Sequence, residues 1–375
     1  MAEVYFRAFK ADNLNERTKI FKELINSVDI NFLSKGQKVG VKVHFGEPGC
    51  TTFVKADYVK EVIDYIKSKG AAPFLTDANT LYKGRRKNGE DHRQVAEEHG
   101  FGESRLGAPV VIADGDDSTY VHEEVINLKH FEKIKYGKAV EDADALAVVS
   151  HVKGHLLCGY GGAIKNLGMG FGSRAAKQMM HADVKPNLSS KISCTSCGTC
   201  VSVCPADAVT MVGDYPEFDL DKCEGCAECI TFCPEGALSI QWSGSPTSVM
   251  EKTAETAFAV VKRKKPKIIY YNFLIDVTPD CDCMTWSGTP LVPDIGVLAS
   301  YDPVAIDAAS LHLIKMTEGR RDSKLKRGFD VGVEKFMALR PDIDGSHILN
   351  YAEEIGLGSK TFTIIDTSIG KKIDS

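Results

Sequence analysis

A doubled cysteine pattern constrains this chain of 375 residues more than any other feature. The spacing C-x2-C-x2-C-x3-C-P occurs twice between residues 194 and 234. The first run supplies Cys194, Cys197, Cys200 and Cys204. The second run supplies Cys223, Cys226, Cys229 and Cys233. Cysteines this closely spaced can bind iron–sulfur clusters, bind zinc or form disulfides.

The arrangement within each run favours iron–sulfur cubes. A [4Fe–4S] cube needs four thiolates at four corners, and three closely spaced cysteines on one loop can bind only three of them. We therefore assign Cys233 to the cluster held by the first three cysteines, and Cys204 to the cluster held by the second three. Structural zinc usually draws on two ligand pairs, and disulfides need an oxidising compartment that nothing here indicates. The spacing predicts two [4Fe–4S] clusters.

Composition places the chain among ordinary globular proteins and suggests a cytoplasmic location. Its twelve cysteines come without an apolar signal segment near Met1, which indicates a reducing compartment. The longest apolar runs are too short to span a bilayer. Residues 190–242 hold two lysines and eight acidic residues, whereas the whole chain has a net charge of −5. This acidic segment favours a redox partner with a basic docking surface and disfavours nucleic acid, although a merely solvated acidic face is the alternative.

Apolar periodicity predicts an α/β fold on both sides of the cysteine runs. Strands are expected at residues 4–9, 38–45, 72–76, 110–112, 145–150, 267–275 and 361–365, and helices at 17–28, 55–69, 91–99, 247–264 and 303–316. This alternation indicates a largely parallel sheet. We expect one discontinuous α/β domain (1–189 with 243–375) interrupted by a cluster domain at 190–242. Two α/β lobes flanking the insert are the alternative.

Four further cysteines follow predicted strands, where open α/β sheets bind ligands. These possible metal or cofactor ligands are Cys50, Cys158, Cys281 and Cys283. In the segment 280–283, Asp-Cys-Asp-Cys, the carboxylates raise the thiol pKa unless a cation compensates. Buried, inert thiols are the alternative interpretation.

Lysines and histidines also gather at strand ends. The candidate catalytic residues are Lys42, His44, His151, Lys153, His155 and Lys165. Such groups could bind a small anionic substrate or deliver protons to a reduced one. A buried histidine beside a surface lysine is the competing interpretation.

The glycine-dense segment 159–172 loosely resembles a phosphate-binding loop without matching a known motif. Its candidate cofactor-binding residues are Gly161, Gly162, Asn166, Gly168 and Gly170. Ser173 is expected to cap a helix over residues 173–181, whose N-terminus would favour an anion. The alternative is a loop that packs closely because glycine permits it. The basic run 83–87 is expected to be a solvated loop, and a role in holding an anion is the alternative.

The cysteine runs resemble the bacterial two-cluster ferredoxin module. The motifs at 151–155, 161–170, 280–283 and 300–307 resemble the domain of unknown function 362 family, whose members often carry such an insert and occur widely in anaerobes. The first resemblance implies low-potential one-electron transfer, and the second implies no particular substrate. We therefore expect an iron–sulfur redox enzyme, such as a ferredoxin-linked oxidoreductase, whose clusters feed a metal, cofactor or anionic-substrate site in the α/β domain. An electron carrier or adaptor with a docking domain is the alternative.

Overall fold

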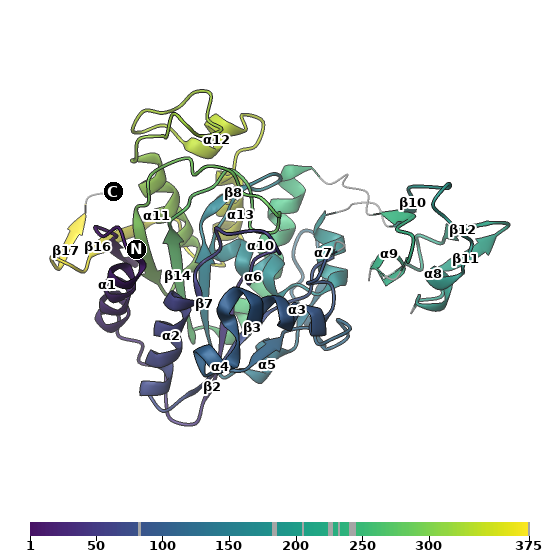
Figure 1. Ribbon diagram of the computed structural model, residues 1–375, viewed down its shortest axis with the longest axis horizontal. Helices are drawn as coiled ribbons and strands as arrows, with labels where there is room; N and C mark the ends of the chain where they lie inside the picture. The colour runs from purple at the N-terminus through teal and green to yellow at the C-terminus, as the bar shows by residue number, and fades with distance from the viewer. Residues whose placement is uncertain are drawn as a thin grey trace.

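The computed structural model describes residues 1–81, 84–181, 186–204, 206–223, 228–231, 233–239 and 245–373. A nine-stranded sheet forms the centre of the larger domain (Figure 1). Its strands, in their order across the sheet, are β17 (Lys371–Ile373), β16 (Phe362–Asp366), β1 (Ala2–Ala8), β15 (Gly296–Ser300), β14 (Ile268–Leu274), β7 (Ala145–His151), β2 (Lys38–Val43), β3 (Ala72–Asp77) and β4 (Val110–Ile112).

The sheet is continuous across the cysteine-rich segment. Strand β7 precedes that segment and β14 follows it, yet the two pair in parallel, with Val148 opposite Tyr270. Separate lobes on either side of the insert therefore do not form. The sheet is mixed, because β15 runs antiparallel between β1 and β14. The sequence analysis missed β15, whose five buried residues lack the polar alternation that marks a half-exposed strand.

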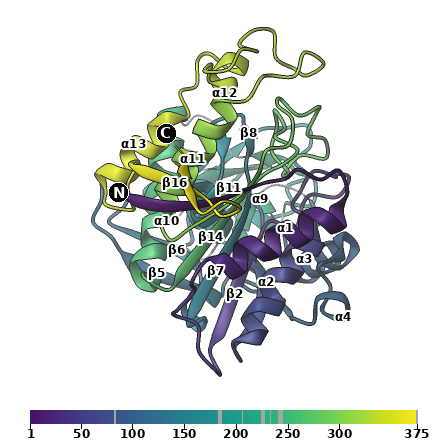
Figure 2. The same ribbon diagram turned by 90° about the vertical axis from the view of Figure 1, so that its left-hand side faces the viewer.

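Helices cover both faces of this sheet (Figure 2). Neighbouring residues of a strand point to opposite faces, so Tyr270 belongs to one apolar core and Tyr271 to the other. The core around Tyr271 lies under α1 (Leu14–Ser27), α2 (Ala56–Ser68), α3 (Gly89–Ala96), a π-helical turn (Glu97–Phe101) and α4 (Glu103–Leu106). The core around Tyr270 lies under α5 (Ala139–Asp142), α6 (Ala163–Phe171), α7 (Arg174–His181), α10 (Pro246–Lys264), α11 (Pro303–Lys315), α12 (Lys335–Leu339) and α13 (Ser346–Glu354).

Two hairpins complete the larger domain: β5 (Val121–Val125) with β6 (Lys133–Gly137), and β8 (Lys153–His155) with β9 (Gly159–Gly161). The helix expected at 303–316 is observed as α11, and the Asp302 carboxylate caps it by accepting the N–H groups of Val304 and Ala305. Among the described residues, no helix is both long and apolar enough to cross a membrane.

The cysteine-rich segment forms a small module at the right of Figure 1. Its elements are β10 (Asn187–Leu188), α8 (Thr199–Ser202), β11 (Val209–Val212), β12 (Tyr215–Phe218), α9 (Glu228–Thr231) and β13 (Leu238–Ser239). The pairs β10–β13 and β11–β12 are both antiparallel. The module has its own small apolar core, which includes Cys200, Cys229 and Ile230. Leu81, from the loop after β3 of the larger domain, belongs to the same core and links the two parts.

Candidate functional site

Four cysteines from both halves of the module line one cavity. Cys194, Cys197 and Cys200 come from the first run, and Cys233 reaches the same cavity from the end of the second. Burial raises the pKa of the Cys200 thiol, and the nearby thiols of Cys197 and Cys233 add to this effect. These are the four residues that the spacing assigns to one cluster.

The remaining predicted cluster ligands are described in part. The structure describes Cys204, Cys223 and Cys229, whereas Cys226 lies outside the described residues. The two distal cysteines have equivalent surroundings: Cys204 Sγ accepts the Ala208 N–H, and Cys233 Sγ accepts the Ala237 N–H, each at 3.3 Å. Hydrogen bonds of this kind to sulfur tune the potential of iron–sulfur centres.

The part of the chain that the structure describes has no group of three His, Cys, Asp or Glu side chains arranged to hold a single metal ion. In the module, Cys194, Cys197, Cys200 and Cys233 line a shared cavity.

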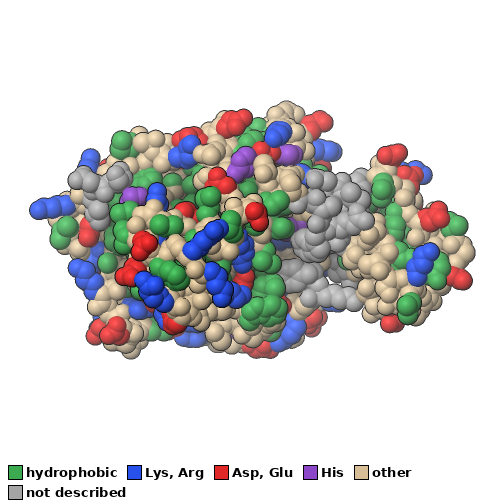
Figure 3. Space-filling model, turned by 90° about the horizontal axis from the view of Figure 1, so that it is seen from above, with side chains coloured by type: hydrophobic (Ala, Val, Ile, Leu, Met, Phe, Trp, Pro, Cys, Tyr) green, Lys and Arg blue, Asp and Glu red, His purple; other side chains and the backbone are tan. Residues whose placement is uncertain are grey.

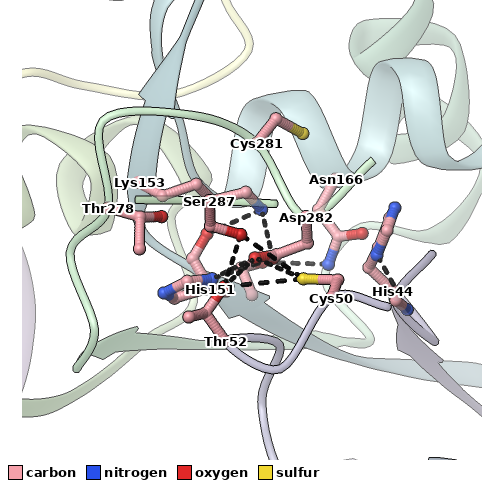
Figure 4. A network of polar contacts seen from close by, with 12 residues as sticks. His44, Cys50, Thr52, His151, Lys153, Asn166, Thr278, Cys281, Asp282 and Ser287 are labelled. Atoms are coloured by element: carbon pink, nitrogen blue, oxygen red, sulfur yellow. Dashed lines mark hydrogen bonds and ion pairs between the residues drawn. The ribbon is translucent and has the colours of Figure 1, made fainter. Parts of the chain in front are cut away.

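A second polar site lies where the strands of the large sheet end, and Asp282 is at its centre (Figure 4). The fully buried Asp282 carboxylate lies 2.8 Å from His151 Nδ1 and 3.3 Å from Lys153 Nζ. Thr52 Oγ1 donates to the same carboxylate at 3.2 Å. Burial would raise the pKa of Asp282, but the charges of His151 and Lys153 outweigh that effect and hold it well below its usual range. His151 and Lys153 were predicted as site residues, whereas Asp282 was considered only for its effect on the neighbouring cysteines.

The second ring nitrogen of His151 is also bonded. His151 Nε2 lies 2.8 Å from the carbonyl oxygen of Ile275 and 3.1 Å from that of Asp276. Both ring nitrogens of His151 therefore lie within hydrogen-bond distance of acceptor oxygens of the protein.

A buried ionic network lies beside this site, at the ends of β2 and β3. Lys42 Nζ is 2.9 Å from Asp77 Oδ1, and Arg86 contacts Asp77 Oδ2 at 3.5 Å. Arg86 Nε also lies 2.9 Å from Glu47 Oε2. Burial favours the neutral form of Asp77, yet Lys42 and the neighbouring cations lower its pKa further than burial raises it. The expectation that the basic run 83–87 is solvated was wrong for Arg86, which is 1% exposed.

Helix α7 adds a polar face to this region. Arg174, Lys177, Gln178 and His181 recur at helical spacing, and the first three are buried. Lys177 Nζ donates to the Asn79 carbonyl at 2.6 Å, and burial lowers the pKa of Lys177 to about 8. Among the described residues, neither amide atom of Gln178 has a hydrogen-bond partner. A buried, unpaired amide is costly, so this face is better suited to contact a polar ligand than to fill a core.

His44 and His155 share an unusual arrangement of their rings. The Nδ1 atom of His44 accepts the Gly46 N–H at 3.0 Å, and the Nδ1 atom of His155 accepts the Cys158 N–H at 3.1 Å. Burial lowers both pKa values well below the ordinary value of histidine. Both rings are then neutral at physiological pH and carry their proton on Nε2. They can donate hydrogen bonds to an anion, but the expectation of proton delivery by a charged imidazole does not fit these two residues.

The glycine-dense segment is mostly helical. Gly168 and Gly170 lie within α6, which packs directly on α10. A methyl group on Gly168 would lie 2.2 Å from the Thr253 carbonyl oxygen, so close helix packing requires glycine there. The N-terminus of α6 is already occupied, because the Asp307 carboxylate accepts the N–H groups of Ala163 and Ile164. The predicted phosphate loop is therefore a packed helix start, and a Cβ on Gly162 would meet the same carboxylate at 2.3 Å.

The other predicted residues of this segment support the two networks. The Asn166 side chain accepts from Lys42 Nζ at 2.7 Å and donates to the Val149 carbonyl at 2.9 Å. Gly161 lies in β9, and a larger residue at this position would place its Cβ against the side chain of Lys165. The prediction that Ser173 caps the next helix is confirmed, because its Oγ accepts the Ala176 N–H at 3.2 Å.

The four additional cysteines separate into two groups. Cys50 contacts Thr52 and Ser287 at 3.5 and 3.4 Å. The other three, Cys158, Cys281 and Cys283, surround the amine of Lys165, which lies 3.9 Å from Cys281 Sγ. Burial raises the pKa of the Cys158 thiol to about 12. An ammonium group among three thiols repels a metal cation, so the prediction of a further metal at these cysteines gains no support from their positions.

The chain belongs to the family described as "Domain of unknown function (DUF362)", which matches residues 39–312. A crystal structure of a Thermotoga maritima protein is similar over 72% of this chain and 52% of its own, with a TM-score of 0.39 and 12% identity. The lactate racemase apoprotein from Thermoanaerobacterium thermosaccharolyticum is similar over 74% and 51%, with a TM-score of 0.36 and 13% identity. This chain thus spans about half the length of both structures, and similarity at this level carries no functional argument. No curated protein matches the sequence.

Proposed function

We propose that this protein is an iron–sulfur electron-transfer protein whose cysteine-rich module binds two [4Fe–4S] clusters. The observation that carries the proposal is the cavity lined by Cys194, Cys197, Cys200 and Cys233. A distal cysteine that completes the ligand set of the opposite run is the arrangement typical of two-cluster ferredoxins. When bound, the clusters would supply single electrons at low potential.

We further propose that the α/β domain is a redox enzyme whose site takes a small anion. The buried cationic side chains around the strand ends include Lys42, Arg86, Lys153, Arg174 and Lys177, and the buried acidic ones include Glu47, Asp77, Asp114, Asp280, Asp282 and Asp307. Burial raises the pKa of Asp114 and of Asp307, which weakens their share of the negative charge. An anionic ligand would stabilise a buried cation such as Lys177, whose amine donates to the backbone carbonyl of Asn79. The unpaired amide of Gln178 and the Nε2–H groups of His44 and His155 would add directional hydrogen bonds.

The contact made by Leu81 supports a connection between the two sites. This residue packs in the core of the module together with Cys229, and the loop to which it belongs begins at the end of β3. That strand ends at Asp77, the centre of the Lys42–Arg86 ionic network. Leu81 thus gives one contact between the core of the module and the loop that follows β3.

Metal analysis of protein purified without oxygen tests the clusters. Two cubes require about eight iron and about eight sulfide ions per chain. Stoichiometric zinc, or iron without acid-labile sulfide, would refute the proposal. Anion binding is tested separately by the stabilisation that phosphate or a dicarboxylate confers on this cluster-loaded protein.

The second candidate function is an electron carrier or adaptor with a non-catalytic docking domain. The acidic character of the module favours it, and acidic side chains are spread over the visible face of this lobe in Figure 3. Under this alternative, Lys153→Met and Gln178→Met should leave electron transfer to a basic partner protein unchanged. Under the enzyme proposal, the same variants should weaken the stabilisation that anions confer.

A further inference from the structure

We propose that Cys281 and Cys283 form a redox-active dithiol that exchanges with low-molecular-weight disulfides. The two residues lie in a tight turn that is closed by a hydrogen bond from the Met284 N–H to the Cys281 carbonyl at 2.9 Å. Positions one and three of such a turn are close enough in space for a disulfide to form. This inference goes beyond the proposed function and does not depend on the clusters.

The turn is held rigidly, which keeps the two thiols together. Asp282, between the cysteines, is buried in the network with His151 and Lys153, and its carbonyl accepts the Glu47 N–H at 3.0 Å. Asp280 on the other side pairs with Arg340 at 2.7 Å. Figure 4 shows the Cys281 sulfur pointing away from the Asp282 network. Packing and polar contacts therefore fix the turn without using either thiol as an anchor.

Lys165 gives this pair its chemical character. Its ammonium group lies 3.9 Å from Cys281 Sγ and is influenced by Cys283 as well. A hydrogen bond from the Cys283 thiol, together with the charge of Lys165, lowers the pKa of Cys281 well below that of a free thiol, and the same shared proton raises the pKa of Cys283. Reactive thiols occur in such electropositive, partly exposed surroundings. Cys158, fully buried at 0% exposure, is the unreactive neighbour.

The pair is accessible from one side. Cys281 is 5% exposed, whereas Cys283 is partly exposed and the following residues Thr285 and Trp286 are exposed. A small disulfide can therefore reach Cys283 more easily than Cys281. A protein disulfide would have to fit around Trp286, so we favour the small molecule.

The exchange balances with one external disulfide, R–S–S–R. The shared proton passes to Cys281, and the Cys283 thiolate attacks one sulfur, so that a Cys283–S–S–R bond forms and RS⁻ leaves. The Cys281 thiol then loses its proton, and the thiolate attacks Cys283 Sγ. The intramolecular disulfide forms, and the second R group leaves as RSH after taking that proton. The pair is oxidised by two electrons, and the external disulfide is reduced by two.

Peptide mapping of the intact, cluster-loaded protein tests this proposal. Trypsin releases residues 268–315 with Cys281 and Cys283 as the only cysteines, and residues 154–165 with Cys158 alone. The protein is equilibrated in glutathione buffers, quenched with acid and digested. As the proportion of oxidised glutathione rises, the mass of the first peptide should decrease reversibly by two hydrogens. The second peptide, which serves as the internal control, should stay reduced.

Lys165→Met and Lys165→Arg form a matched pair of variants. Loss of the cation should slow alkylation of the dithiol by iodoacetamide by about tenfold near neutral pH, and arginine should retain most of the rate. A 268–315 peptide that stays reduced, or that carries only glutathione adducts throughout the range, would overturn the proposal. Because the test reads the thiols of the folded wild-type protein, a failure here leaves the cluster stoichiometry as a separate result.

Discussion

The cysteine-rich module and the strand-end site of the α/β domain assemble their functional groups in opposite ways. In the module, seven described cysteines come from one short segment, and three of the four that line the cavity lie within seven residues. In the α/β domain, Lys42, Asp77, Arg86, His151 and Asp282 come from widely separated parts of the sequence and meet only because the strands end together. Local spacing therefore encodes the first site, whereas the topology of the sheet encodes the second.

The two sites also differ in what their burial costs. Thiols tolerate apolar surroundings and pack as part of the small core of the module. Buried charges such as Lys42 and Arg86 are stable only when they are paired. Substitutions in the module should therefore affect cofactor content first, and substitutions in the ionic networks should affect folding first.

The largest effect is expected for Cys233→Ser. This distal cysteine lines the cavity of the first run, so its loss should remove that cluster and reduce iron from about eight to about four per chain. Iron and sulfide analysis of anoxically purified protein measures the change. Cys158→Ala, at a buried cysteine outside the module, is the control and should retain the full iron content. Equal iron in both variants would contradict the crossed ligand assignment.

Adjacent arginines provide the next test. Arg86 is buried between Asp77 and Glu47, so Arg86→Met should destabilise the α/β domain by about 3–5 kcal/mol because it removes a buried cation that contacts both carboxylates. Arg85, which pairs with Glu98 at the surface, should tolerate the same substitution with almost no change. Urea unfolding followed by circular dichroism measures both. Similar stabilities of the two variants would mean that Arg86 is solvated after all.

A pH effect of intermediate size should come from Asp307. Burial raises its pKa in the folded protein to about 6, above the ordinary 3.8. The folded state then holds this proton more tightly than the unfolded state, so stability should fall by roughly 3 kcal/mol as pH rises from about 4 to about 6. Above that range the contribution should be constant. The free energy of unfolding of the wild type and of Asp307→Asn is measured across this pH range. The difference between the two proteins should fall as pH rises, and the same pH dependence in both would refute the prediction.

The smallest change in stability is expected for Gln178→Met. The amide of Gln178 has no partner, so its replacement should leave the ligand-free protein unchanged or more stable by about 1 kcal/mol. The same substitution should weaken stabilisation by phosphate or a dicarboxylate. Exposed Gln94→Met is the matched control and should preserve the anion response. If Gln178→Met destabilises the protein strongly, the amide has a structural role instead.

The sequence predicted the parts of this molecule that depend on local patterns. The helices α1, α2, α10 and α11 and most strands of the sheet were identified from periodicity. Strand β15 was missed because all five of its residues are buried. Helix α6 was taken for a loop because its glycines serve close packing: Gly168 lies against α10, and Gly170 lies against the Lys42 side chain. The reason for each glycine becomes clear only when its neighbours in the fold are known.

For the candidate site, the sequence predicted which residues lie at the strand ends better than it predicted what those residues do. His151 and Lys153 do lie at the strand ends, but their shared partner Asp282 was noticed only as a neighbour of two cysteines. Arg86 was assigned to a solvated loop because a run of basic residues usually is one. The polar face of α7 could have been found by its spacing, since Arg174, Lys177, Gln178 and His181 recur at three- and four-residue intervals. Their burial could not be inferred without the sheet beneath them.

Electron paramagnetic resonance of the anoxically purified protein, reduced with dithionite, tests the central claim most directly. Two reduced [4Fe–4S] clusters should give about two unpaired spins per chain, and Cys233→Ser should give about one. A reduced wild-type sample without a signal, together with zinc in place of iron, would contradict the account.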